Sequence, residues 1–286
     1  MFYLGCPIWA NKAWVGTLFP SGSKQREFLY LYSRRLNAVE GNTTFYGLPT
    51  PDTVARWRDE TPPGFKFCLK FPKAITHERR LRGAEADTAD FVARLNVLGD
   101  RAGASLLQLP PSFGGSDLPA LLAYLDQLPP LPGGCAVEVR HPDFFGGPAE
   151  AALEAGLRAR DVARVLYDQR GLRGAEPSDD DIRRAQAAKP NVPVRFGRSA
   201  SFAFVRYIAH PDIAANAPLL DEWAEQVAGW LNAGDDVYFF CHHKNDYYAP
   251  VVARDIHQRI SRLAPLPPLP EWGAAPPAAP SQPALF

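Results

Sequence analysis

Polar side chains interrupt the apolar stretches of this sequence near the ends of short runs that have the length of β-strands. Glu40 and Asn42 stand two residues apart in one such run, and Glu138 and Arg140 repeat this spacing in another. Residues two apart on a strand point to the same face of a sheet. A charge inside a buried strand is costly unless it is paired, so we interpret these side chains as members of one polar site. The full set is Glu40, Asn42, Lys70, Gln108, Glu138, Arg140, Asp168, Arg206 and His242.

The charges of this set favour an anionic or polar substrate. Three carboxylates stand beside three cations, whereas a divalent-metal site usually collects carboxylate and imidazole ligands without cations close by. Arginine and lysine would hold such a substrate, and a carboxylate such as Glu40 or Glu138 would act as general acid or base, as in a hydrolase or a lyase. A glycosidase-like pair of Glu40 and Glu138 stays open, since the sequence does not give their separation. No cofactor motif is found, and binding of a divalent metal is left open. The candidate catalytic residues are Glu40, Lys70, Glu138 and Asp168.

Further side chains are candidates for substrate binding because they lie in or just after the same runs. His77 and Tyr46 follow two of them, and His141 stands before a proline, where packing of the loop is the alternative. His242 and His243 are consecutive, so they cannot both point into one site. A buried ion-pair lattice without a substrate is the alternative for the whole set. The candidate substrate-binding residues are Asn42, Tyr46, His77, Gln108, Arg140, His141, Arg206 and His242.

Eight strand-like apolar runs must position these residues, with amphipathic helical stretches between them. This alternation predicts an α/β fold with a parallel sheet, and eight strands are the number that closes a single TIM-like (β/α)8 barrel. The carboxyl ends of the strands would then bring the candidates to one mouth. A doubly wound open sheet is the alternative, but its usual glycine-rich nucleotide motifs are absent. The polar residues 171–201 indicate an extended loop with one short helix. The strand-like runs are residues 2–7, 36–42, 65–71, 105–110, 135–141, 163–168, 202–208 and 236–243.

The composition limits the classes of partner. With 31 basic and 31 acidic residues among 286, the formal net charge is zero, which argues against non-specific nucleic-acid binding by the whole surface. The four cysteines are far apart in the sequence and form no zinc motif, so we expect buried thiols. We find neither a signal peptide nor a run of about 18 apolar residues, and we expect a cytoplasmic protein with no membrane contact.

Five blocks of the sequence resemble the signature blocks of the YecE-like family, a domain of unknown function. They are "VEGNTTFYGLP", "WRDETPPGFKFCLKFPKAITH", "LLQLPPSF", "AVEVRHPDFF" and "YDQRG", and the resemblance runs in order from residue 2 to about residue 260. It implies a TIM-like barrel and a bacterial cytoplasmic protein, but it implies no reaction. The blocks contain Glu40, Asn42, Lys70, His77, Gln108, Glu138, Arg140, His141 and Asp168.

The end of the chain has a different composition and predicts a different role. We divide the chain into a barrel at 1–263, a Pro/Ala-rich linker at 264–281 and a terminal peptide at 282–286. Gln282, Leu285 and Phe286 are similar to the Gln-x-x-Leu-Phe peptide by which bacterial proteins dock on the DNA polymerase sliding clamp. Pro283 departs from the usual second position of that peptide. A proline-rich tether would let the barrel work beside the clamp.

Three functions are compatible with these observations. The first is an enzyme of nucleic-acid maintenance that is tethered to the clamp, which explains the neutral charge and the tail together. The second is a metabolic enzyme for a phosphorylated or carboxylated small molecule. The third is a clamp-associated binding module without catalysis, in which the polar set is structural. A turnover assay and a clamp-binding assay together separate the three.

Overall fold

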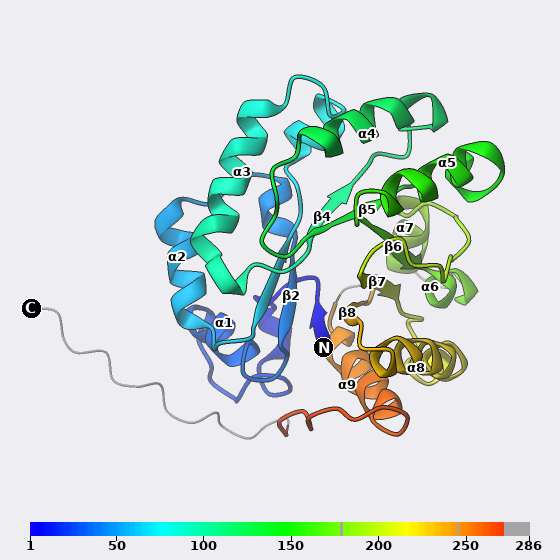
Figure 1. Cartoon of the computed structure of the whole chain (residues 1–286). Coiled ribbons are helices and arrows are strands. Elements are labelled where there is room, and N and C mark those ends of the chain that lie inside the picture. Colours follow the sequence, from blue (N-terminus) through cyan, green and yellow to red (C-terminus); the bar gives the residue numbers. More distant parts are fainter. Residues whose placement is uncertain (178–179, 245, 272–286) are drawn as a thin grey trace, which may run out of the picture.

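The strands of the protein are parallel and form a single sheet that curls into a ring, as the sequence predicts (Figure 1). The computed structural model describes residues 1–177, 180–244 and 246–271. Within this part of the chain, the eight strands follow the order β3-β2-β1-β8-β7-β6-β5-β4. The strands are β1 (Phe2–Cys6), β2 (Ala38–Gly41), β3 (Lys66–Leu69), β4 (Ser105–Gln108), β5 (Cys135–Glu138), β6 (Ala163–Asp168), β7 (Phe202–Ile208) and β8 (Asp236–His242).

The ring is closed more loosely between β3 and β4 than between other neighbours. These two strands meet through isolated bridges and through two backbone hydrogen bonds, from Gly103 N–H to Phe67 O and from Phe71 N–H to Leu106 O, both of 2.9 Å. On the opposite side, β1 pairs with β8 over a continuous register that runs from Phe2 to Gly5. The result is a nearly closed α/β barrel of the TIM type.

Helices surround the ring in the order of the chain (Figure 1). The connection from β6 to β7 contains two helices in its described part, where the sequence predicts one short helix within a long loop. The first of these begins directly after the strand, because Asp168 Oδ1 accepts the Arg170 N–H at 2.9 Å and closes the turn. The α-helices are α1 (Phe28–Tyr32), α2 (Pro51–Glu60), α3 (Glu85–Leu98), α4 (Leu118–Gln127), α5 (Gly147–Arg158), α6 (Arg170–Gly174), α7 (Asp180–Ala188), α8 (Ala217–Asn232) and α9 (Ala249–Ile260).

Two apolar cores follow from the alternation of side chains along the strands. The outer core lies between strands and helices. The inner core fills the ring, where Tyr3 stacks on Tyr238 with ring centroids 4.7 Å apart. Gly5 is required where β1 meets β2, because a Cβ there would lie 2.1 Å from the carbonyl oxygen of Ala38. The inner core therefore occupies the ring below its carboxyl end and leaves the polar side chains at the mouth. Its large members are Tyr3, Leu106, Tyr167, Phe204, Tyr238 and Phe240.

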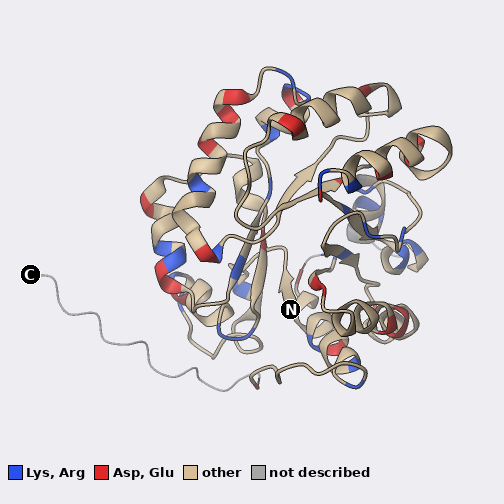
Figure 2. Cartoon of the chain, viewed as in Figure 1, with Lys and Arg blue, Asp and Glu red and all other residues tan. Residues whose placement is uncertain are grey.

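The chain folds back under the barrel after α9. Leu266 and Leu269 pack against the outer core, and the carbonyl oxygen of Pro267 lies 3.0 Å from His257 Nε2. Residues 264–271, the first part of the predicted linker, thus contact the barrel at the amino ends of its strands. Charges of both signs are spread over the surrounding helices (Figure 2). In the described residues, no helix is both long enough and apolar enough to cross a membrane.

Candidate active site at the carboxyl ends of the strands

A buried arginine joins two glutamates from opposite parts of the ring. Arg206 of β7 donates to both oxygens of Glu40 of β2, from Nε to Oε2 at 2.7 Å and from Nη2 to Oε1 at 2.8 Å. Its Nη1 donates to Oε2 of Glu138 of β5. Both carboxylates are fully buried and Arg206 is 6% exposed. The predicted set therefore contains a continuous ion cluster, which we call the mouth cluster: Glu40, Asn42, Gln108, Glu138, Arg140, Arg206 and His242.

The remaining members attach to the two carboxylates. Asn42 Nδ2 donates to Glu40 Oε1 at 2.8 Å, and His242 Nε2 lies 3.3 Å from Glu40 Oε2. Arg140 Nε donates to Glu138 Oε1 at 2.6 Å, and its Nη2 donates to Gln108 Oε1 at 2.7 Å. Each of the four carboxylate oxygens thus accepts a guanidinium N–H. The alternating direction of strand residues explains why His242 joins this cluster, whereas His243 Nε2 lies 3.4 Å from Pro211 O instead.

The two carboxyls are held in the ionised form. Burial raises the pKa of Glu138, but attraction to Arg206 and Arg140 outweighs this effect and brings the value to about 2. Burial also raises the pKa of Glu40, and Arg206 and His242 outweigh it, so the pKa lies well below its usual value. Burial lowers the pKa of His242 despite Glu40. The glutamates therefore act at neutral pH as fixed anions that orient their arginines.

Lys70 differs from the other cations of the mouth because it has no anionic partner. It directly follows β3 and continues the inner face of the strand, and the residue is only 7% exposed. Among the described residues, its Nζ makes no ion pair or hydrogen bond, and it lies 3.9 Å from the centroid of the Phe45 ring. Burial, followed by repulsion from Arg206, lowers the pKa of the ammonium to about 8. Lys70 is therefore a buried amine that can titrate close to neutral pH.

Two residues that the sequence did not single out belong to this region. Tyr167 is 4% exposed, and its ring centroid lies 5.8 Å from the guanidinium carbon of Arg140 and 5.7 Å from that of Arg206. Its hydroxyl has no hydrogen-bond partner among the described residues. Lys189 follows α7, and burial and repulsion from Arg206 and Arg140 lower its pKa, which places its charge near theirs. Tyr167 could have been found from the alternation along β6, whereas a loop lysine leaves no such signal.

His77 lies at the edge of the mouth, and three other predicted residues lie elsewhere. The ring of His77 packs on Phe45 at 5.0 Å, and burial and Lys70 lower its pKa to about 4. Asp168 points outward from β6 and accepts a hydrogen bond from Trp223 Nε1 of α8 at 2.7 Å. Tyr46 is 85% exposed. His141 accepts the Asp143 N–H at 3.2 Å and caps a short helical turn. The structure thus does not bring Asp168, Tyr46 or His141 into the mouth cluster.

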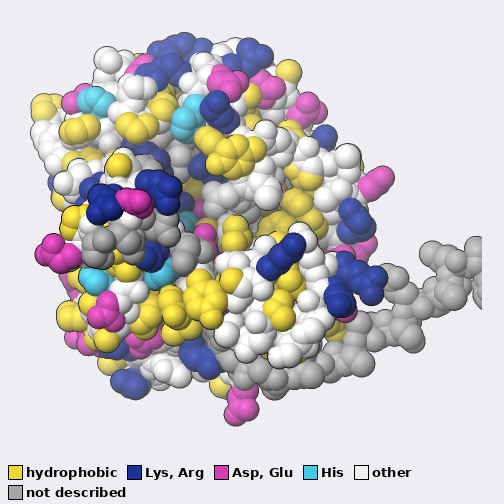
Figure 3. Space-filling view, turned by 180° about the vertical axis from the view of Figure 1, so that it is seen from behind, with side chains coloured by type: hydrophobic (Ala, Val, Ile, Leu, Met, Phe, Trp, Pro, Cys, Tyr) yellow, Lys and Arg dark blue, Asp and Glu magenta, His cyan; other side chains and the backbone are white. Residues whose placement is uncertain are grey.

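The molecule is hollowed near the centre of the ring when it is viewed from behind, and Lys, Arg and His side chains gather around the hollow (Figure 3). Within residues 1–177, 180–244 and 246–271, no group of three or more His, Cys, Asp or Glu is placed to hold a metal ion. The four cysteines are free and buried, and burial raises the pKa of each thiol.

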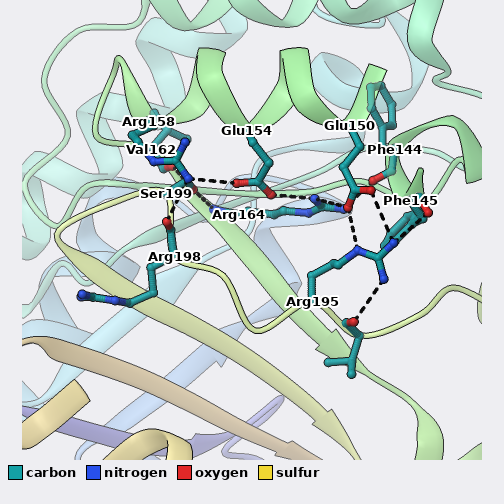
Figure 4. Close-up of polar contacts among 11 residues, drawn as sticks. Phe144, Phe145, Glu150, Glu154, Arg158, Val162, Arg164, Arg195, Arg198 and Ser199 are labelled. Carbon is teal, nitrogen blue, oxygen red and sulfur yellow. Dashed lines mark hydrogen bonds and ion pairs between the residues drawn. The ribbon is translucent and has the colours of Figure 1, made fainter. Parts of the chain in front are cut away.

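A second buried arginine lies outside the ring and is also bracketed by two glutamates (Figure 4). Arg164 points outward from β6, and its Nη1 donates to Glu150 Oε1 at 3.1 Å and to Glu154 Oε1 at 2.6 Å, both on α5. Its Nη2 donates to Phe144 O at 2.6 Å. Arg195, from the connection before β7, donates to Glu150 Oε1 at 2.7 Å. This outer cluster, made of Glu150, Glu154, Arg164 and Arg195, fastens α5 and the loop to the barrel wall.

Comparisons with known proteins identify relatives of the whole chain. Residues 3–274 match the family described as "Protein of unknown function DUF72". The UPF0759 protein YecE of Escherichia coli strain K12 is 39% identical over 289 residues that cover both chains fully, and its counterpart in strain O157:H7 is 38% identical. A crystal structure of a DUF72 family protein from Thermotoga maritima superposes with a TM-score of 0.68 at 22% identity and covers 91% of this chain and 99% of that one. A DUF72 family protein from Enterococcus faecalis also gives 0.68, at 17% identity, over 98% of this chain and its own full length. These two structures agree with the barrel fold.

Proposed function

The chain belongs to the family described as protein of unknown function DUF72, and from this premise we propose that the mouth of its barrel is the active site of an enzyme for an anionic small molecule. The substrate class is a phosphorylated or carboxylated metabolite. The reaction is of the hydrolase or lyase type, with proton transfer by a side chain of the mouth. The position of the polar residues at the carboxyl ends of the strands supports this choice, since chemistry in barrels of this kind takes place there.

One observation carries the proposal: the mouth holds more positive charge than its own carboxylates can neutralise. Arg206 and Arg140 already satisfy all four oxygens of the two glutamates. The ammonium groups of Lys70 and Lys189 make no ion pair with any described residue; Lys70 is buried and Lys189 is half-buried. Unpaired buried cations are costly, so an anionic ligand would gain from entering. Arg140, whose side chain is 15% exposed, would meet the anion at the entrance.

The contacts also divide the roles among the candidate catalytic residues. Glu40 and Glu138 are held ionised by arginines, which suits a positioning role better than the exchange of a proton. Lys70 has a free amine with a pKa of about 8, which suits a general base or a nucleophile. His77 is neutral at pH 7 and would line the edge. Asp168 takes no part, because it faces α8.

The test compares two lysines on the same strand and the same face. Calorimetry with inorganic phosphate measures binding, and mass spectrometry of a mixture of phosphorylated and carboxylated metabolites measures turnover. We expect Lys70→Met to weaken phosphate binding by about tenfold or more and to abolish turnover. Lys66→Met is the control, because Lys66 lies at the other end of β3 and its Nζ donates to Asp100 O at 2.8 Å. Equal phosphate binding by wild type and Lys70→Met would contradict the proposal.

Docking on a sliding clamp, with a role in nucleic-acid maintenance, is a separate proposal about the tail. It is supported by the sequence of Gln282, Leu285 and Phe286, which lie outside the described residues. Calorimetry of the purified clamp with the full chain and with a chain that ends at Ser281 tests it. We expect heat only from the full chain, and equal heat or none from both would reject it.

A further inference from the structure

We propose that Lys70 is a nucleophile that forms an imine with the carbonyl carbon of the substrate, so that the substrate is an anionic aldehyde or ketone. This inference rests on the proposed function, because it concerns the same mouth. It goes further by naming the covalent step and the functional group that must accompany the anionic group.

The surroundings of Lys70 are those of a reactive amine rather than of a structural lysine. Buried lysines in proteins are normally paired, and surface lysines keep their ammonium in water. Lys66 shows the usual pattern on the same strand, where its Nζ donates to a backbone carbonyl. Lys70 is 7% exposed and has no acceptor among the described residues, and burial and the cations Arg206 and Arg140 lower the pKa of its ammonium against the opposing effect of Glu138 and Glu40. Burial away from water and a neighbouring cation both favour a neutral, nucleophilic lysine.

The protonation state agrees with this role. A pKa of about 8 leaves roughly one Lys70 amine in ten unprotonated at pH 7, compared with fewer than about one in a thousand for an ordinary lysine. The ring of Phe45 packs against the nitrogen from one side at 3.9 Å. Glu138 and Glu40 lie near enough to raise the pKa of the amine, but neither forms an ion pair with it among the described residues, and burial together with Arg206 and Arg140 outweighs them.

A second observation points to a polar atom of the ligand beside the same arginines. The hydroxyl of Tyr167 is buried and has no partner among the described residues, although such groups are nearly always hydrogen-bonded. Its ring centroid lies 5.8 Å from the guanidinium carbon of Arg140 and 5.7 Å from that of Arg206. A ligand with an oxygen beside Tyr167 and an anionic group beside Arg140 would give the hydroxyl a hydrogen-bond partner and the guanidinium an ion-pair partner. An anionic carbonyl compound carries these two groups.

The covalent step balances with the groups present. The lone pair of Lys70 Nζ forms a bond to the carbonyl carbon, the nitrogen gives up one of its two protons, and the carbonyl oxygen takes up a proton and becomes a hydroxyl. This hydroxyl takes a second proton and leaves as water, while the nitrogen and carbon form a protonated imine. The imine then accepts the electron pair of an adjacent C–H or C–C bond and becomes an enamine, as a proton or a carbonyl fragment leaves; this is the chemistry of a lyase. A proton from water returns to the enamine carbon and restores the imine. Hydrolysis of the imine returns the amine.

The experiment traps the imine with sodium cyanoborohydride, which reduces it to a secondary amine. The intact protein is treated with pyruvate or with dihydroxyacetone phosphate, and peptide mapping by mass spectrometry locates the adduct. The mass added is that of the probe less one oxygen atom. Acetone and dihydroxyacetone are the matched probes, because they offer the same carbonyl without the anionic group. We expect the anionic probes to label Lys70 at least about tenfold faster than Lys66, and the uncharged probes to lose this preference.

Two variants separate the imine from binding of the anion. Lys70→Arg keeps the positive charge but cannot form an imine, so we expect it to bind inorganic phosphate and to give no adduct at residue 70. Tyr167→Phe should slow the labelling of Lys70 and leave that of Lys66 unchanged. Phosphate binding by wild type without preferred labelling of Lys70 overturns the imine and leaves the proposed function standing. If the wild type neither binds phosphate nor shows preferred labelling of Lys70, both the imine and the proposed function are overturned.

Discussion

The mouth cluster and the outer cluster are built from the same parts and differ in what they leave unsatisfied. In each, a buried arginine on a strand joins two glutamates, Arg206 inside the ring and Arg164 outside it. The glutamates of the outer cluster keep contact with solvent, with side chains 19% and 22% exposed, and no Arg164 nitrogen is left buried without a partner. The glutamates of the mouth are fully buried, and an unpaired ammonium and an unpaired hydroxyl lie near them.

This difference distinguishes a structural ion-pair network from a candidate binding site. A network that serves only the fold can end when its charges and hydrogen bonds are satisfied, as the outer cluster does between α5 and the barrel wall. In the mouth cluster, the two carboxylates form ion pairs with two arginines. The ammonium of Lys70 and the hydroxyl of Tyr167 have no hydrogen-bond partner among the described residues. Buried polar groups without partners cost stability, and proteins retain such costs mainly where function needs them.

The largest effect should come from removing the central arginine of each cluster. Arg206→Met leaves two fully buried carboxylates without their shared partner, and we expect a loss of about 3–5 kcal/mol in the free energy of unfolding. Arg164→Met should cost less, about 1–3 kcal/mol, because its glutamates can turn to water or to Arg195. Urea unfolding followed by circular dichroism measures both. Equal losses would contradict the idea that the deeper burial of the mouth glutamates makes the loss of their arginine more costly.

A smaller effect should appear in the pH dependence of stability. It tests whether the unpaired Lys70 of the mouth titrates at a lower pH than an ordinary lysine. The folded pKa of about 8 lies below the unfolded value of 10.5, so the unfolded state binds more protons between these values. Wild type should therefore gain about 1–3 kcal/mol relative to Lys70→Met as the pH rises from 8 to 10.5. Urea unfolding at a series of pH values gives the difference curve. Lys66→Met removes a hydrogen-bonded lysine and is the control. If it changed the pH dependence of stability as Lys70→Met does, the lowered pKa of Lys70 would be refuted.

The smallest effect concerns the hydroxyl of Tyr167. Because this group has no partner among the described residues, Tyr167→Phe should change the free energy of unfolding by no more than about 0.5 kcal/mol. Tyr32→Phe is the matched control, because the Tyr32 hydroxyl accepts the Cys6 N–H at 2.7 Å and donates to Ala38 O at 2.9 Å. We expect that control to cost about 1–3 kcal/mol. A comparable loss in Tyr167→Phe would show that its hydroxyl is already satisfied in the protein.

The sequence was sufficient for the fold and for most of the mouth cluster. Apolar runs of strand length between amphipathic stretches predicted the eight strands, and the two-residue spacing placed Glu138 and Arg140 on one face, where they form an ion pair. That Arg206 bridges Glu40 and Glu138 depends on how three distant strands meet across a ring, and no local pattern contains this information.

The sequence did not predict which face of a strand points into the ring. On β6, one face carries Tyr167 and the other carries Asp168 and Arg164, so both faces end in a polar group. Asp168 forms an ion pair with Arg170 and accepts a hydrogen bond from Trp223 on the outside, and Arg164 forms ion pairs with glutamates of α5. These partners come from helices whose packing the sequence did not reveal. Lys189 reaches the mouth from a connecting loop, where no periodicity predicts a direction.

The weak pairing between β3 and β4 also indicates where new chain ends could be introduced by circular permutation. Those two strands are the edges of the sheet, so spatial order around the ring runs β4, β5, β6, β7, β8, β1, β2, β3. Met1 donates to Asp236 at the start of β8, and residues 265–270 line a groove together with Met1. The two ends of the barrel are thus close enough to be joined by a short linker. A circular permutant that begins before β4 would have strands that follow one another in space as they do in sequence, and its new ends would lie where the ring is least tightly held.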